Sequence, residues 1–297
     1  MLREYAVDPE VALSSLVSLQ RFFSEFGAQH GRVISEIPSS WEREQQAKIR
    51  ELNLTPVAKR KAFDHIKKLA STSVVGGLAI PGELDVWIEK ARYVKRVYGI
   101  HAILHRELNS HAGEFDYGNM LEECPDEWVI QHTSSVPRNA QNMAKAIEQA
   151  LSIATVALFV DPYFHPTEDR YRAPLIEFIN RLCGGRRECK KAYLHTTTQQ
   201  EKGRIDIIQG LSNHVQPLLP SGFTLETWIW PQALLHDRFM LTKNVGFAFG
   251  HGLDEARYQD AIQVNINRLG EDARAVEFKK FSTQGLRLDD EIVFTGT

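Results

Sequence analysis

From about residue 128 onward, short apolar runs alternate with amphipathic helical patterns, and this alternation constrains the fold more than any other feature. The strongest strand signal is the continuous apolar run TVALFVDPYF, which is typical of a strand covered on both faces. Helical spacing follows in APLIEFINRL, and further strands are predicted in KAYLHTTT, FTLETWIW, HDRFML, GFAFG and AIQVNIN. Strands and helices joined by short connections predict an α/β sheet domain.

The first 120 residues have a different pattern of apolar and helix-starting residues, which predicts helices. Helix starts are indicated at Asp8-Pro9, Thr55-Pro56 and Pro81-Gly82. Apolar side chains recur at helical spacing after the first start, at Leu13, Leu16, Leu19, Phe23 and Phe26. We therefore predict an α-helical N-terminal region over residues 1–120 and an α/β domain over residues 121–297. The apolar stripe should pack inside the protein and not anchor it to a membrane.

Composition limits the class of protein and of partner. Apolar residues make up 43% and charged residues 25% of the chain, as in ordinary globular proteins. The net charge of −3 excludes a global basic field, so any contact with phosphates must come from a local patch. Three cysteines suit a reducing compartment, and no apolar run approaches the ~20 residues of a membrane span. These features predict a soluble, cytoplasmic protein.

The chemistry concentrates in the segment LLHDRFMLTKNVGFAFGHGLDE. His236 and Arg238 are two residues apart and therefore share one face of a predicted strand. Four residues separate Arg238 from Lys243, and six more precede Gly250-His251-Gly252. A neutral imidazole can attack phosphorus, a second group must protonate the leaving oxygen, and cations must hold the remaining oxygens. His236 is the candidate nucleophile and Arg238 the candidate phosphate cation.

This segment resembles a degenerate form of the phospholipase D superfamily signature, which is His-x-Lys, four residues, Asp, six residues, then Gly and a small residue. Arg238 stands in place of the lysine and Lys243 in place of the aspartate. The residues HDR followed by G-x-GLD are similar to those of the phospholipase-D-like C-terminal domain of MIT-domain proteins and their bacterial relatives. The preceding strand, which ends in Asp161-Pro162-Tyr163, is similar to theirs too. The resemblance covers roughly residues 128–297 and implies an α/β phospholipase-D-like fold.

The same resemblance implies a phosphohistidine intermediate at His236, which needs a carboxylate to orient the ring and a second histidine. Because Lys243 is not a carboxylate, Asp254 or Glu255 is the better candidate, and we assign Glu255. The second histidine is either His195, at the end of KAYLHTTT, or the His236 of a second chain across a two-fold axis. Loss of activity is the third alternative.

The candidate site residues should line one pocket at the strand ends, where α/β sheets bind ligands. In particular, His236, Arg238, Asp161 and Glu255 should lie together. The candidate ligand-binding residues are Asp161, Tyr163, Arg170, Arg172, Lys243, Gly250 and Gly252. No metal site is expected, because Cys183, Cys189 and His195 lack the tight pairing of zinc ligands. No cofactor is expected either, since the chain has no P-loop and no complete dinucleotide fingerprint.

The resemblance implies a metal-independent nuclease or phosphodiesterase, a hydrolase whose substrate is nucleic acid or another phosphodiester. The setting that it suggests is a bacterial antiviral defence or mobile-element system, with the chain as a homodimer or as part of a multi-protein defence complex. The alternative is a non-catalytic module that binds DNA or other nucleic acid, a phosphoinositide or a partner protein. Any cleavage activity should survive EDTA, because the phosphohistidine route uses no metal.

Overall fold

The computed structural model describes residues 1–11, 16–106, 111–200, 202–257, 262–282 and 292–297. They divide into two compact units, Leu2–Gln131 and His132–Thr297 together with Met1. The division falls later than the boundary expected at residue 120. The reason is Trp128, which is buried in the N-terminal core, where its ring lies edge-on to Tyr5 and beneath the Arg32 guanidinium.

The N-terminal unit contains a five-stranded sheet in the order β3-β2-β1-β4-β5, and every neighbouring pair is parallel. Its strands are β1 (Arg3–Val7), β2 (Arg32–Ser35), β3 (Val74–Val75), β4 (Ala102–His105) and β5 (Glu114–Asp116). The prediction of a purely helical region is therefore corrected to α/β. These strands have five residues or fewer, and short apolar runs of that kind are easily absorbed into neighbouring helical patterns.

The helices of this unit are α1 (Leu16–Glu25), α2 (Trp41–Glu51), α3 (Pro56–Thr72), α4 (Trp87–Tyr98) and α5 (Tyr117–Glu123). The start predicted at Thr55-Pro56 is present, because the Thr55 hydroxyl caps α3 by accepting from the Ala58 N–H at 3.3 Å. Asp8 instead follows β1, and the next helix begins at Leu16. Leu19 and Phe26 of the apolar stripe are buried in the unit's own core and Phe23 is partly buried against it, while Leu13 lies outside the described residues.

The C-terminal unit contains an eight-stranded sheet in the order β13-β9-β8-β7-β10-β11-β12-β6. Strands β7, β8 and β9 are parallel neighbours, and the other pairs are antiparallel. The α/β class predicted for this part is confirmed. The strands are β6 (Thr133–Pro137), β7 (Ala157–Val160), β8 (Lys191–Thr197), β9 (Thr224–Trp230), β10 (Phe239–Thr242), β11 (Gly246–Phe249), β12 (Gln263–Arg268) and β13 (Ile292–Thr295).

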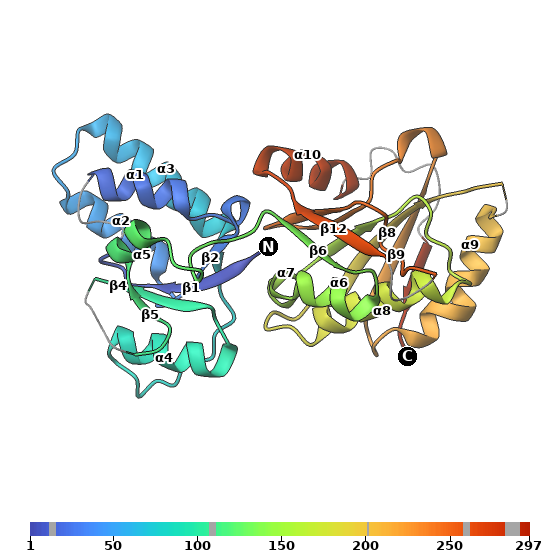
Figure 1. The fold of residues 1–297 in the computed structure, drawn as a ribbon, viewed down its shortest axis with the longest axis horizontal. Helices are drawn as coiled ribbons and strands as arrows, with labels where there is room; N and C mark the ends of the chain where they lie inside the picture. The colour runs from blue at the N-terminus through green and yellow to red at the C-terminus, as the bar shows by residue number, and fades with distance from the viewer. Residues whose placement is uncertain (12–15, 107–110, 201, 258–261, 283–291) are drawn as a thin grey trace. The chain divides into compact units, whose positions relative to one another are not determined.

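Helices cover both faces of this sheet (Figure 1). One face carries α6 (Ala140–Ala146), α7 (Glu148–Ile153) and α8 (Asp169–Cys183), where Phe178 stacks on Phe159 of β7. The other face carries α10 (Glu271–Ser282), whose Phe281 packs with Leu158 and Val160. A further helix, α9 (Arg204–Gly210), follows β8. Across the ranges that the structure describes, no helix combines the length and the apolar character needed to cross a membrane.

Candidate functional site

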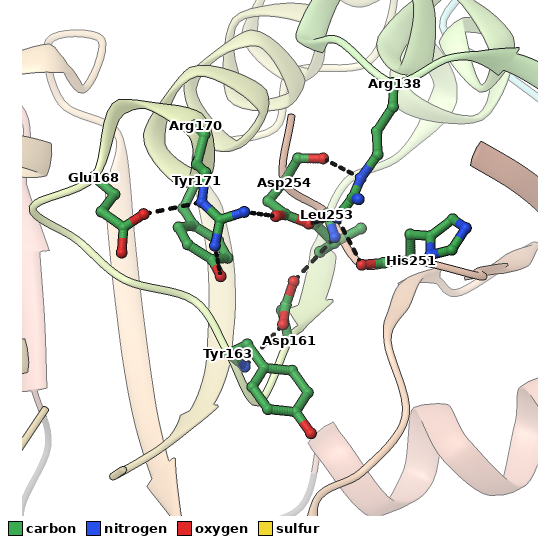
Figure 2. A network of polar contacts seen from close by, with 9 residues as sticks. All are labelled: Arg138, Asp161, Tyr163, Glu168, Arg170, Tyr171, His251, Leu253 and Asp254. Atoms are coloured by element: carbon green, nitrogen blue, oxygen red, sulfur yellow. Dashed lines mark hydrogen bonds and ion pairs between the residues drawn. The ribbon is translucent and has the colours of Figure 1, made fainter. Parts of the chain in front are cut away.

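The site residues gather at one edge of the C-terminal sheet. Because β7, β8 and β9 are parallel, their carboxyl ends meet at this edge, and the antiparallel hairpin of β10 and β11 begins and ends there. The turn after β7 begins at Asp161, β10 is preceded by Arg238, and β11 leads into residues 250–254. Asp161 and Leu253, which are 92 positions apart in the sequence, are thereby brought into contact (Figure 2).

Asp161 ties these segments together. Its side chain is 1% exposed, and its two oxygens accept hydrogen bonds from the backbone N–H groups of Tyr163 and Leu253, each at 2.9 Å (Figure 2). Burial raises the pKa of this carboxyl, and the two backbone hydrogen bonds work in the opposite direction. Asp161 therefore holds the turn after β7 against the loop that follows β11.

Arg238 lies beside Asp161 on the same face of the sheet. In the antiparallel pair of β10 and β7, Phe239 lies opposite Val160. The residue before Phe239 and the residue after Val160 therefore also lie opposite each other, and these are Arg238 and Asp161. The position of Gly252 shows how close the side chains of Asp161 and Arg238 are to each other. A Cβ at Gly252 would lie 3.2 Å from an Asp161 oxygen and 3.6 Å from Cδ of Arg238. Gly252 also has φ of +110°, which side-chain-bearing residues rarely adopt.

The Arg238 guanidinium stacks over the ring of Tyr163, with 4.8 Å between its central carbon and the ring centroid. Tyr163 is 45% exposed, so one part of the ring faces solvent. Among the described residues, the buried Nε of Arg238 has no hydrogen-bond partner and no carboxylate forms an ion pair with this side chain. Within the described ranges, Arg238 is therefore a cation that no carboxylate neutralises by direct pairing.

Two neighbouring arginines are engaged within the protein instead. Asp254, which is buried, accepts from Arg138 and from Nη1 of Arg170, the latter at 2.9 Å. Arg170 also donates to Glu168 at 2.9 Å and to the Tyr171 hydroxyl at 2.7 Å (Figure 2). The structure thus places Arg170 in an internal network next to the site. Arg138, which completes this network, was not among the candidate residues, and Asp254, named as the alternative to Glu255, pairs with these arginines.

Glu255 and Arg172 lie on another side of the loop. The Glu255 carboxylate accepts from the Ala140 N–H at 2.7 Å, at the start of α6. Both residues line a cavity of about 880 Å³ between α6 and α8, where Arg172 donates to the Pro166 carbonyl at 3.0 Å and pairs with Asp169. The structure does not bring Glu255 to His236, because its carboxylate supports the start of a helix.

His195 is on the opposite face of the sheet from Asp161. It pairs with Val160 across β7 and β8, so alternation of side chains points it toward α10. The ring is 0% exposed, accepts from Nε1 of Trp230 at 2.9 Å and packs against Trp228 and Phe281. The sheet lies between His195 and Arg238, and aromatic rings enclose His195 on its own face, so the role assigned to it from the sequence is corrected to a structural one.

The remaining motif residues lie in three different places. Lys243 is exposed in the turn between β10 and β11, at the sheet edge opposite the site. Gly250 is exposed, and its N–H donates to the Asn265 carbonyl at 3.0 Å. His236 is exposed just before β10, with Nε2 at 3.1 Å from the Ala233 carbonyl. No carboxylate in the described ranges bonds to His236, so the orienting role assigned to Glu255 is not seen, and a pocket shared by His236, Asp161 and Glu255 stays a prediction.

Two further residues at this edge carried no assigned role in the sequence. His251 is exposed, while its backbone carbonyl accepts from Arg138 at 2.8 Å and its ring points away from Asp254 (Figure 2). Lys202 is buried, and its Nζ donates to the Phe164 carbonyl at 2.5 Å. Burial lowers the pKa of Lys202 to about 8. The hairpin spacing of HDRF and FGHG could have indicated His251, whereas nothing local marks Lys202.

The described residues contain no cluster of three or more His, Cys, Asp or Glu side chains able to hold a metal ion.

Comparison with known proteins gives limited information. No protein-family model matches the chain, and no curated protein matches it. Among solved structures, it is similar to the phospholipase D family member Nuc from Salmonella typhimurium, with 14% identity and a TM-score of 0.32, over 50% of this chain and 89% of Nuc. It is also similar to TrmBL2, an archaeal chromatin protein, with 14% identity and a TM-score of 0.28, over 55% of each chain. TM-scores this far below 0.5 establish neither a shared function nor a shared mechanism.

Proposed function

We propose that the C-terminal unit binds the phosphodiester backbone of a nucleic acid at the sheet edge formed by Asp161, Arg238 and the loop 250–254. One observation carries the proposal. Arg238 stacks on the half-exposed ring of Tyr163 and, within the described chain, makes no ion pair, whereas Arg138 and Arg170 share Asp254. A guanidinium in this state keeps its planar fork available for phosphate oxygens.

The geometry favours nucleic acid over a phosphoinositide headgroup or a protein partner. Tyr163 offers an aromatic face next to the cation, and a base adjacent to a bound phosphate can stack on such a face. Both oxygens of Asp161 already accept backbone hydrogen bonds, so they do not compete for the donors of Arg238. With a net charge of −3, the chain needs a local site of this kind to attract a polyanion.

Binding of a fluorescent single-stranded oligonucleotide, followed by anisotropy at low salt, tests the proposal. Arg238→Gln should weaken binding roughly tenfold, because it removes a charge-assisted phosphate contact. Tyr163→Ala should weaken it by a smaller factor, since stacking alone is lost. Lys243→Gln is the matched control, because it removes one positive charge at the opposite edge of the same sheet. Equal affinities for Arg238→Gln and Lys243→Gln would refute the site.

A second candidate function is metal-independent cleavage of the bound phosphodiester, favoured by the register of the β10–β11 hairpin. The Phe249 N–H donates to the Arg238 carbonyl at 3.0 Å, and this second function requires the chain to continue that register for two more steps, beyond the ends of both strands, so that His236 meets His251. Both histidines are exposed. His251 could then supply the proton donor that the motif lacks, in place of His195.

In this reaction, an imidazole nitrogen of His236 attacks phosphorus and forms a P–N bond while the P–O bond to the leaving group breaks. The protonated His251 gives its proton to the leaving oxygen. Water then attacks phosphorus, the P–N bond breaks, and the proton of the water passes to His251. Arg238 holds the non-bridging oxygens throughout.

Cleavage of a labelled oligonucleotide in EDTA tests this second function. His236→Ala and His251→Ala should each abolish cleavage while leaving binding within about twofold of the parent, because Arg238 remains. A homodimer that shares two His236 side chains is the competing arrangement. It predicts full activity for His251→Ala and near-inactive hybrids when His236→Ala is mixed with the parent chain. Activity that needs added magnesium would refute both arrangements. A role in bacterial defence stays a proposal that depends on this activity.

A further inference from the structure

We infer that the N-terminal unit binds a small phosphate- or carboxylate-bearing molecule between the carboxyl ends of β1 and β4. Its five strands are parallel and ordered β3-β2-β1-β4-β5. The chain therefore passes from β1 to β2 on one side and returns to β4 on the other side of β1. Open parallel sheets bind ligands outside the carboxyl ends of their strands at such a reversal of strand order. This inference goes beyond the proposed function, since it concerns the other unit.

Two cavities lie at this reversal point. The smaller one, of about 310 Å³, is lined in part by Arg21, Tyr117 and Leu121, and the larger one, of about 640 Å³, by Asp8 and Trp87 among others. Both are also lined by His105, the last residue of β4, and by Arg106, which follows it. Each volume falls in the range of small-molecule sites in proteins. The crevice is therefore formed by the strand ends themselves.

Tyr117 supplies an independent observation that points to a ligand. It lines the smaller cavity, it is only 6% exposed, and its buried hydroxyl has no hydrogen-bond partner in the described part of the chain. Buried polar atoms are nearly always paired in native proteins, because leaving one unpaired costs stability. An oxygen of a molecule bound in this cavity could accept the missing hydrogen bond.

The charges around the smaller cavity favour an anion. Arg106 is exposed and has no ion pair among the residues that the structure describes. Within those same residues, Arg21 makes one hydrogen bond, to the Leu121 carbonyl at 3.2 Å. On the acidic side, Asp116 caps α5 by accepting a backbone N–H at 2.9 Å, and Glu122 is exposed to solvent. Two arginines thus keep donors for a ligand, and the more buried carboxylate is already satisfied.

The larger cavity suits the uncharged part of such a ligand better than its anionic group. Its wall contains the carboxylates of Asp8 and Glu10 together with the indole of Trp87. Glu10 forms an ion pair with Lys48, so this side carries little net positive charge. We therefore place the anionic group in the smaller cavity, against Arg21 and Arg106.

The test uses the full chain with Arg238→Gln, so that the proposed C-terminal phosphate site is silenced. Isothermal titration calorimetry with inorganic phosphate, adenosine monophosphate and citrate separates phosphate from carboxylate ligands and simple ions from larger molecules. Hydrogen exchange then locates the site, and a bound probe should protect residues 102–106 and 117–123. Binding of no probe, or protection confined to other residues, would overturn the inference.

Two variants in the same background sharpen the result. Arg106→Gln should weaken binding roughly tenfold, whereas Arg60→Gln, on the exposed surface of α3, should leave it unchanged. Tyr117→Phe keeps the ring in the core and removes a hydroxyl that has no protein partner. It should therefore leave the melting temperature unchanged or higher while weakening binding about threefold or more. Equal affinities for Arg106→Gln and Arg60→Gln would count against the site.

Discussion

Asp161 and His195 are neighbours in the C-terminal sheet, yet their side chains enter opposite environments. The Asp161 N–H donates to the His195 carbonyl at 2.9 Å, so the two backbones are in direct contact. Asp161 points to the α8 face, where it accepts two backbone hydrogen bonds beside Arg238. His195 points to the α10 face, where it is enclosed by Trp228, Trp230 and Phe281. Both lie at strand ends, but only Asp161 helps to form a site.

The difference teaches that a polar residue at a strand end is not enough to predict a functional site. Side chains alternate between the faces of a sheet, so the register of neighbouring strands decides which strand-end residues meet. Thr196, one position after His195, has the opposite orientation, and Nζ of Lys202 lies 3.5 Å from its hydroxyl on the Asp161 side. At these strand ends, the α8 face therefore carries Asp161, Arg238 and Lys202, whereas the α10 face encloses His195 in an aromatic core.

The largest loss of stability is expected for Asp161→Ala. It leaves two buried backbone N–H groups without acceptors and should cost roughly 4 kcal/mol of unfolding free energy. Urea unfolding measures this loss, and hydrogen exchange should show faster opening of residues 250–254. Oligonucleotide binding should fall as well, because the loop beside Arg238 is no longer held. Asp161→Asn, which keeps one acceptor oxygen, should lose less; an Asp161→Ala protein as stable as the parent would contradict this role.

The free energy of unfolding should depend on pH through Lys202, whose side chain lies on the α8 face. Its pKa of about 8 lies below the ordinary lysine value of 10.5, so above pH 8 the unfolded chain binds more protons than the folded one. This group's contribution to stability should therefore rise between about pH 8 and 10.5, by roughly 3 kcal/mol at most. Unfolding of the parent and of Lys202→Met across this range measures the difference. Parallel pH profiles for the two proteins would show that Lys202 is not desolvated.

Gly252→Ala should lower the stability of the protein by a smaller amount. The added Cβ would come within 2.9 Å of an Asp254 oxygen, at a φ of +110°. Strain of this kind should cost about 2 kcal/mol and weaken oligonucleotide binding, because the loop shifts against Arg238. Gly222→Ala is the matched control, since it also has positive φ but an unobstructed Cβ position. If both variants bind the oligonucleotide equally well, close packing at Gly252 does not matter for the site.

The smallest loss of stability is expected for a substitution on the α10 face. His195→Phe removes the acceptor for the Trp230 indole N–H but keeps an aromatic ring in the core, and should cost about 1 kcal/mol. Because His195 faces away from Arg238, oligonucleotide binding and any cleavage should be unchanged. Melting curves and anisotropy measure both quantities on one preparation. Loss of cleavage with retained stability would restore His195 as a catalytic candidate.

Much of the C-terminal fold could be predicted from the sequence, because its strands are long or strongly apolar. TVALFV and TLETWIW stand out against the helical patterns between them. The N-terminal sheet could not, since β3 has two residues and β5 has three. Strands this short are defined by their partners across the sheet, and a single-sequence pattern does not identify the partners.

The site was predictable only in part, for the same reason. Asp161 and Gly252 could be singled out because a strand end and a glycine next to a motif are local features. Arg138 could not, because Asp254 lies 116 positions away in the chain. His195 was assigned as a histidine at a predicted strand end, and Glu255 as a carboxylate next to the motif. The pleat of β8 turns His195 to the other face, and Glu255 supports the start of α6.

The central claim is that a phosphodiester chain binds on the α8 face at Arg238 and Tyr163. Photocrosslinking with a single-stranded oligonucleotide that carries 5-iodouracil tests it most directly, because this base forms adducts with aromatic rings that it stacks upon. Mass spectrometry of the digested complex should locate the main adduct on Tyr163, and Arg238→Gln should reduce its yield roughly tenfold, in line with the expected loss of affinity. A main adduct outside residues 161–164 and 236–254, with Tyr163 unmodified, would contradict the account.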